Sequence, residues 1–445
     1  MKVAATLLPL LLAGCATYTP LPLGDGDAVL KPADSAALSR AAGAIDRPYL
    51  TPVAIDLAQP LDPNAIAVIA VIANPDLKAK RARAGVADAQ AFAARLMPDP
   101  TFSIGASPVL SGPDPFVDIA SSLGLDLNAL RTRGVTIAAA RSSAEQVRLD
   151  LAWAEWQTAG QARLQAVRIL GLERSAALAA INRAAAASML ERTLRAAGRG
   201  DLAPDQVNTA RATAFDTQDR ERTLERDLAA ARLELARLLG LQPRSQLRLA
   251  PTPLPAPPPD AEALFALART RRTDLRALEA GYAAEEATVH KAVLDQFPAL
   301  GLAINGNRDS AGNTLIGPAV SFTLPLWNRN RGGIAIERAT RAALKAEYDA
   351  RLFQTRADIA AAVGGIMVAR RQRDALLRDL PAATRFAAAS RRAADRGDLA
   401  LATAETAEQA ARDKQVLLAA SEQDIVEQTI ALELLTGALK ETWPS

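Results

Sequence analysis

Apolar residues recur along much of the chain at spacings of three and four, with charged residues between them. In one stretch the positions are Leu149, Trp153, Trp156, Leu164, Val167 and Leu170. This is the period of an α-helix with one apolar side. Proline disrupts helix interiors, and it is absent from 116–203, 205–242, 326–380 and 382–443. We therefore expect helices at roughly 65–97, 132–198, 203–240, 260–297, 332–396 and 399–437, with Pro381 kinking the fifth.

The period changes from 3.6 to 2 in two places, which predicts strands. In the first, apolar residues alternate with small or polar ones from Val117 to Leu127, and in the second from Val320 to Leu324. Each run follows a shorter partner across a loop, so we expect hairpins at 101–127 and 299–324. One apolar and one small polar face is typical of membrane β-barrel strands, but a soluble ribbon packed on helices is the alternative. Four strands cannot close a barrel, because closure needs about eight.

The two halves of the chain repeat each other. The segment Arg195 to Ala203 agrees with Arg392 to Ala400 at eight of nine positions. We interpret this as a tandem duplication, with a first repeat at 65–241, a Pro-rich linker at 242–259, a second repeat at 260–437 and a tail at 438–445. The expected fold class is mainly α with a small β part.

Composition excludes most catalytic chemistry. The chain has 445 residues with one His and one Cys, so it cannot build a Cys/His zinc cluster or a Ser-His-Asp triad. We expect no enzyme activity, no metal site and no cofactor. Lys and Arg number 52 against 49 Asp and Glu. This balance argues against nucleic acid as a partner.

The N-terminus predicts secretion. Val3 to Leu12 is apolar but shorter than the roughly twenty residues that span a bilayer, so 1–14 is expected to be a signal peptide. The sequence from Leu12 to Cys15 resembles the lipobox of bacterial lipoproteins, which implies a lipid on Cys15 and a lipidated, extended segment at 15–64. Ala16 is not Asp, which in that class favours the outer membrane. No later segment is expected to cross a membrane as a helix.

Together these elements resemble the TolC family of outer-membrane efflux proteins, over nearly the whole mature chain. The order of helix, β-hairpin, long helix, tight turn and helix, written twice, is that family's unit. The segment Leu324 to Gly332 is similar to a junction motif of the CzcC-like heavy-metal-efflux branch. The resemblance implies a homotrimer in the outer membrane of a Gram-negative bacterium, with a shared twelve-stranded β-barrel and a helical α-barrel in the periplasm.

Two turns resemble the tips that bind periplasmic adaptor proteins in this family. They contain Arg199, Gly200, Asp201 and Leu202, and Arg396, Gly397, Asp398 and Leu399. Gly200 and Gly397 are expected to cap the long helices in a left-handed conformation, and Asp201 and Asp398 to N-cap the returning helices. Acidic residues narrow the tunnel mouth in the family, and here the nearest candidates are Asp395 and Glu405. Pairing with arginine is the alternative for both.

Phe322, Trp327, Arg329 and Arg331 lie beside the second hairpin and are expected at the membrane interface with outer-membrane lipid. The alternatives are core packing at the barrel–helix junction for the two aromatics and pairing with nearby carboxylates for the two arginines. The resemblance implies the passive exit duct of a tripartite efflux system. It would receive solutes, among them heavy-metal cations, from an inner-membrane pump and an adaptor. The competing hypothesis is a lipid-anchored periplasmic coiled-coil scaffold without a channel.

Overall fold

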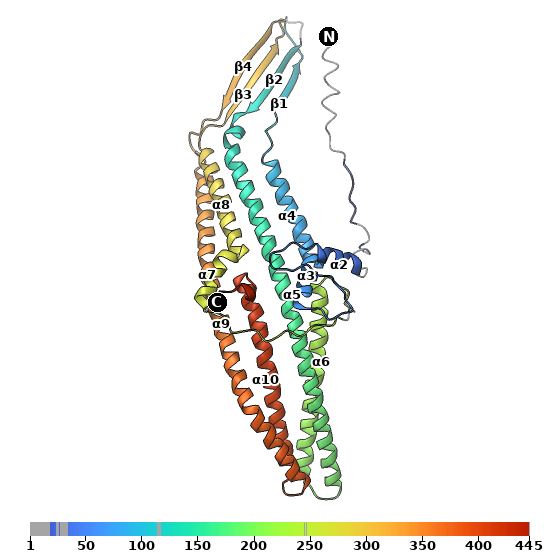
Figure 1. The fold of residues 1–445 in the computed structure, drawn as a ribbon. Helices are drawn as coiled ribbons and strands as arrows, with labels where there is room; N and C mark the ends of the chain where they lie inside the picture. The colour runs from blue at the N-terminus through green and yellow to red at the C-terminus, as the bar shows by residue number, and fades with distance from the viewer. Residues whose placement is uncertain are drawn as a thin grey trace.

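The protein, analysed as a computed structural model, is a long helical rod with a small antiparallel sheet at one end (Figure 1). The structure describes residues 18–23, 26, 34–113, 117–243, 245 and 247–444. The predicted signal peptide and Cys15 lie outside these residues. The mainly helical fold with a small sheet confirms the predicted class.

The same order of elements occurs twice. The first set is α3 (Pro63–Ala73), α4 (Pro75–Ala93), β1 (Thr101–Ser107), β2 (Asp118–Asp126), α5 (Leu127–Gly198) and α6 (Pro204–Leu238). The second set is α7 (Ala261–Arg271), α8 (Thr273–Leu294), β3 (Leu300–Arg308), β4 (Thr314–Phe322), α9 (Arg331–Asp395) and α10 (Leu401–Thr436). α2 (Ser35–Gly43) precedes them, and a 3₁₀ turn, η2 (Lys440–Thr442), follows.

Two of the predicted helices are in fact pairs of helices. The expected helix 65–97 is broken at Asn74 and the expected helix 260–297 at Arg272, both of which have extended backbone conformations. Pro75 explains the first break, because proline excludes helical geometry from the residue before it. No proline marks the second. There Arg272 turns back to form a buried ion pair with Asp274, at 2.6 Å.

The returning helices end against these breaks. The side chain of Asn74 donates to the carbonyl of Leu238 at the end of α6 (2.9 Å), and Arg272 donates to the carbonyl of Leu435 at the end of α10 (3.1 Å). α6 therefore continues below α4 along α5, and α10 continues below α8 along α9 (Figure 1). Each long helix is accompanied over its length by two shorter ones placed end to end.

Glycine makes this close approach possible. Gly240 and Gly437 follow α6 and α10 with φ of 61° and 68°. A Cβ on Gly240 would lie 2.4 Å from the carbonyl oxygen of Ala73, and one on Gly437 would lie 3.2 Å from the backbone of Arg272. A Cβ at Gly240 would force the helix ends apart, and one at Gly437 would require a shift of a few tenths of an ångström.

The main core lies at the middle of the rod. α3 is apolar on all sides, and its residues 65–71 are buried between the N-terminal segment, α5 and α6. Glu155 of α5, only 3% exposed, accepts from Arg47 and Arg81, each at 2.6 Å. Burial raises the pKa of Glu155, but the hydrogen bonds from the two guanidinium groups outweigh it and hold the pKa below its ordinary value.

Several predicted boundaries need correction. The segment 15–64 is not wholly extended, because α2 forms within it with Asp34 as its N-cap. α5 begins at 127 rather than 132, since Asp126 ends β2 and at once accepts from the backbone of Asn128 and Ala129. α9 contains Pro381 in its interior and is continuous there, so the kink expected at Pro381 stays a prediction.

α9 also differs from the expectation that no later helix suits a membrane. It contains an 18-residue window of mean hydropathy 1.2, enough by length and composition alone to cross one. In the fold, Ile359 and Ile366 of α9 are buried against Leu264, Ala268 and Leu432 of α7 and α10. Of the apolar window itself, 22% is buried, so packing within the rod covers part of it.

Gly240→Ala is expected to destabilise the fold by more than Gly200→Ala. Both glycines have positive φ, which costs a residue with a Cβ about 1 kcal/mol, but a Cβ on Gly200 meets nothing within 4 Å. At Gly240 the added Cβ would also collide with the carbonyl oxygen of Ala73, so the two helix ends must separate. Thermal unfolding of the two variants measures the difference, and equal losses would contradict the proposed close contact.

Candidate channel-forming surfaces

The sheet has four strands in the order β1-β2-β3-β4, all antiparallel. Opposed residues in such a ladder lie on the same face. One row runs from Phe102 through Leu123 and Ile304 to Pro318, and the adjacent row runs from Ser103 through Ser122 and Asn305 to Gly317. The sheet therefore has one mainly apolar face, which also carries Ser121, Arg308 and Thr314, and one face of small and polar residues apart from Leu315.

The apolar face is not covered by the rest of the chain. Its large side chains are exposed, with Phe102 at 67% and Ile316 at 82%. Within the described residues, β1 and β4 each pair on one side only, so both edges of the sheet remain open. Such a sheet exposes apolar side chains and unpaired backbone groups to water, which stable soluble folds avoid.

Polar side chains connect the starts of the long helices to the end of α8, next to the sheet. Arg131, in the first turns of α5, donates to the carbonyls of Pro298 and Leu294 at 3.2 and 3.1 Å. Asn330, before α9, donates to the carbonyl of Ala292 at 2.8 Å and has a φ of 51°. These bonds hold the starts of both long helices against the end of α8.

The predicted membrane-interface residues lie at this junction. Phe322 ends β4, and Trp327 in the following loop is exposed. Arg329 and Arg331 donate to the carbonyls of Pro325 (3.4 Å) and Trp327 (3.0 Å) within the same loop. The motif from Leu324 to Gly332 thus has a structural role, and contact with lipid stays a prediction for all four residues.

Both predicted tips have the same structure at the far end of the rod (Figure 1). Gly200 and Gly397 have φ of 82° and 83°, as expected for left-handed caps. Asp201 donates its N–H to Ala196, and Asp398 donates to Ala393, at 3.0 and 2.9 Å. Together with the bonds from the glycine N–H groups, these form a Schellman motif at each turn.

The expected N-caps were wrong. α6 begins after Ala203 and α10 after Ala400, with no side-chain cap on either. Asp201 and Asp398 instead pair with Arg199 and Arg396, each at 2.9 Å. The aspartates lie too early in the turn to cap the helix, and the arginine two residues before each is within reach. Leu202 and Leu399 are half-buried beside them.

Glu405, a candidate gate residue, lies between three helices. Its side chain, 13% exposed, accepts from Arg192 of α5 at 2.5 Å and from Arg391 of α9 at 2.9 Å. The hydrogen bond that Arg391 donates to Glu405 raises the pKa of Arg391. Asp395, exposed, lies 3.3 Å from the same guanidinium. Both acids are therefore paired with arginine, which was the alternative to a role as gate residues.

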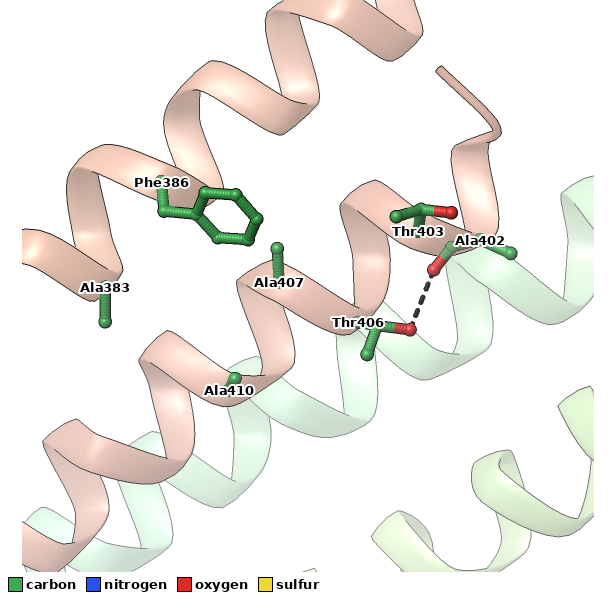
Figure 2. A pocket seen from close by; sticks show the side chains of 7 residues that line it. All are labelled: Ala383, Phe386, Ala402, Thr403, Thr406, Ala407 and Ala410. Carbon is green, nitrogen blue, oxygen red and sulfur yellow. Dashed lines mark hydrogen bonds between the residues drawn. The ribbon is translucent and has the colours of Figure 1, made fainter.

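A groove near the second tip was not predicted. Ala383 and Phe386 of α9 line it with Ala402, Thr403, Thr406, Ala407 and Ala410 of α10, around a volume of about 450 Å³. Figure 2 shows the ring of Phe386 beside Ala407, and the hydroxyl of Thr406 directed to its own helix, where it donates to the carbonyl of Ala402 at 2.9 Å. The groove is therefore mainly apolar. The sequence signal was a large apolar residue ten positions before a polar turn.

Among the residues that the structure describes, no group of three or more His, Cys, Asp or Glu side chains could hold a metal ion. Glu405 and Asp395 form ion pairs with arginine side chains.

Replacing Glu405 with Gln is expected to loosen the contact of α5, α9 and α10. A hydrogen bond to a charged group contributes about 1.5–3 kcal/mol. Arg192 would lose its ion pair, and Arg391 would keep only its longer contacts with Asp395 and Glu408. Hydrogen exchange of amides near the second tip should accelerate. Glu191→Gln is the control, because its exposed pair with Arg195 (3.7 Å) contributes little. A change in ion selectivity without faster exchange would instead support a gate.

Comparison with known proteins agrees with this architecture. Residues 264–438 match the family described as "Outer membrane efflux protein". No curated protein matches the chain. The matched family is described as an efflux protein and not as an enzyme, in agreement with the prediction for this chain.

Solved structures resemble the chain over most of its length. The outer-membrane channel OprN is 19% identical with a TM-score of 0.70, covering 96% of this chain and 100% of its own. VceC of Vibrio cholerae is 17% identical with a TM-score of 0.70, covering 85% and 96%. CusC is 16% identical with a TM-score of 0.68, covering 84% and 92%. The chain thus has the fold of outer-membrane channels, and residues 264–438 carry the sequence pattern of the outer membrane efflux family.

Proposed function

We propose that the protein is the outer-membrane exit channel of a tripartite efflux system. The observation that carries this proposal is the sheet, with its exposed apolar face, its small polar face and its two open edges. In a bilayer the apolar face meets lipid and the polar face meets water, as in other membrane barrels. A ribbon left in water would instead keep the apolar face exposed to solvent.

Closure of the barrel requires further copies of the chain. Three copies supply twelve strands, enough for closure, if β1 of one copy pairs with β4 of the next. The same ring places the helices around a tunnel that continues from the barrel toward the tips. Export is then passive, with no cofactor, and the energy comes from an inner-membrane pump.

The remaining parts of the proposal concern the ends of the chain and the cargo. A lipid on Cys15 would anchor the first residue of the mature chain in the outer membrane, with the rod extending into the periplasm. The junction motif supports heavy-metal cations as cargo only by resemblance. Its bonds to the loop are explained by structure alone, so other solutes fit equally well.

An adaptor is proposed to bind at the tips, and the two tips differ. The groove of the second hairpin is lined by alanines, threonines and Phe386, whereas the corresponding positions near the first tip include Asp205 and Gln206. An amphipathic helix of an adaptor would place its apolar side in the second groove. Arg199 and Arg396 would contribute polar contacts at the rim of the interface.

Leu123→Arg is expected to prevent insertion, whereas Ser122→Arg should not. Leu123 lies on the apolar face, where an arginine at mid-bilayer costs about 2–4 kcal/mol, and Ser122 lies on the polar face of the same strand. The readouts are heat-modifiable migration of the trimer and single-channel conductance in planar bilayers. A monomeric unaltered protein without conductance would support the scaffold hypothesis instead.

Phe386→Glu is expected to reduce capture of a coexpressed periplasmic adaptor, measured by cross-linking from cysteines at Leu202 and Leu399. A charge in the apolar groove opposes burial of the adaptor's apolar side. Phe353→Glu is the matched control, since Phe353 lies exposed on the same helix, 33 residues farther from the tip. Capture at mid-helix positions, with none at the tips, would refute the assignment.

A further inference from the structure

The four helices near the tips form an open row. α9 packs on α10, α10 on α5, and α5 on α6, so α9 and α6 are the two outer members (Figure 1). The strands follow the same order, with β4 on the side of α9 and β1 on the side of α6. In a closed ring of copies, α9 of one copy would therefore lie beside α6 of the next.

The outer side of α9 carries a row of arginines. Ala387 faces inward, where it is buried with Ala407 and Ala411 of α10. Arg378, Arg385 and Arg392 lie nine and two residues before it and five after it. At ~100° per residue they project ~140–180° away from Ala387 around the helix. We call these three residues the arginine row.

The arginine row is exposed, and within the part of the chain described here its guanidinium groups have no ion pair or hydrogen-bond partner. Most other arginines near this end are paired, as Arg391 is with Glu405. Three unpaired cations at seven-residue spacing on one side of a helix form a continuous basic edge.

The outer side of α6 carries aspartates. Glu221 faces α5, where it pairs with Arg183 at 2.6 Å. Asp205, Asp216 and Asp219 lie sixteen, five and two residues before it, which places them ~140–160° away from that face. We call them the aspartate row. Asp216 and Asp219 have only exposed contacts within their own helix, to Arg220 at 2.8 Å and Arg222 at 3.5 Å.

The two rows also match in height. Arg392, Arg385 and Arg378 lie four, eleven and eighteen residues above Arg396, which corresponds to about 6, 16 and 27 Å. Asp205, Asp216 and Asp219 lie two, thirteen and sixteen residues above Ala203, or about 3, 20 and 24 Å. Each arginine thus has an aspartate within about one turn of its own level.

From this geometry we infer that the arginine row of one copy pairs with the aspartate row of the next copy, forming a charged seam at the tunnel mouth. The inference rests on the proposed ring of copies and identifies the residues that join them near the tips. Charge complementarity of this kind selects the partner and its register more than it adds affinity. The contacts of Asp216 and Asp219 with Arg220 and Arg222 are weak and exposed. They can remain while an arginine from α9 of the next copy binds the same two aspartates from outside.

Disulfide cross-linking of the full-length protein tests the seam. The variant with Arg385→Cys and Asp216→Cys should form disulfide-linked dimers and trimers in lipid under mild oxidation. The mismatched variant combines Arg385→Cys with Glu234→Cys, eighteen residues higher on α6, or about 27 Å away. It should give at least about tenfold less product, because cysteines whose Cα atoms are more than about 7 Å apart cannot bridge. The parent protein, with Cys15 alone, measures the background.

Charge exchange tests whether the seam is electrostatic. The reporter is a second matched pair, Arg378→Cys with Asp219→Cys. Adding Arg385→Glu or Asp216→Arg singly should lower its cross-linking yield, because like charges then face each other. Adding both should restore it. Loss of yield in the double exchange as well would mean that a different contact joins the helices.

The two levels of the proposal fail separately. If the protein conducts and its copies associate, but the matched and mismatched pairs cross-link equally, the seam is wrong and the channel stands. If the parent protein neither associates nor conducts, the proposed function is wrong and the seam with it.

Discussion

The abutment of helix ends at the middle of the rod is the constraint on which the other features depend. Gly240 meets the carbonyl of Ala73, and Gly437 meets the backbone of Arg272, with no room for a side chain at Gly240. Each contact lets a shorter helix end where the next begins, so that α5 and α9 are never left without a neighbour. A long isolated helix has little stability of its own in water, and packing along its length supplies it. The distance between the sheet and the tips is maintained in this way.

Because the chain is a tandem repeat, this contact between helix ends occurs once in each half, and the two halves lie side by side. This arrangement leaves the molecule open along two sides, at β1 and α6 on one and at β4 and α9 on the other. In the proposed ring, each contact joins unlike sides of successive copies, so like edges do not meet and the ring closes by rotation. The basic edge of α9 and the acidic edge of α6 fit that requirement, whereas two identical edges would repel each other.

Arginine has several distinct tasks in this chain. At the middle of the rod, Arg47 and Arg81 neutralise a buried carboxylate, Glu155. At the junction with the sheet, Arg131 binds carbonyl groups at the end of α8. Near the tips, Arg391 binds Glu405 inside the row of helices, while the arginine row faces outward. The planar guanidinium, with its five donors, suits each of these tasks.

The sequence by itself determined the elements. Apolar spacing, the absence of proline and the two alternating runs located the long helices and hairpins, and the repeated glycines located both left-handed caps. These are local properties, since a few neighbouring residues decide each of them. Pro75 is a local signal for one helix break that the expected helix 65–97 overlooked. The other break, at Arg272, has no local signal and depends on Asp274 and the end of α10.

Only the tertiary structure decided which residues meet. It gave Glu405 its arginines from α5 and α9, turned Asp201 and Asp398 away from the expected caps, and created the groove beside Phe386. It also decided which sides of α6 and α9 face outward. Such contacts join residues that are far apart in sequence, and their geometry depends on how whole helices pack. A pattern read along one chain contains the period of each helix but not the rotation at which it meets its neighbour.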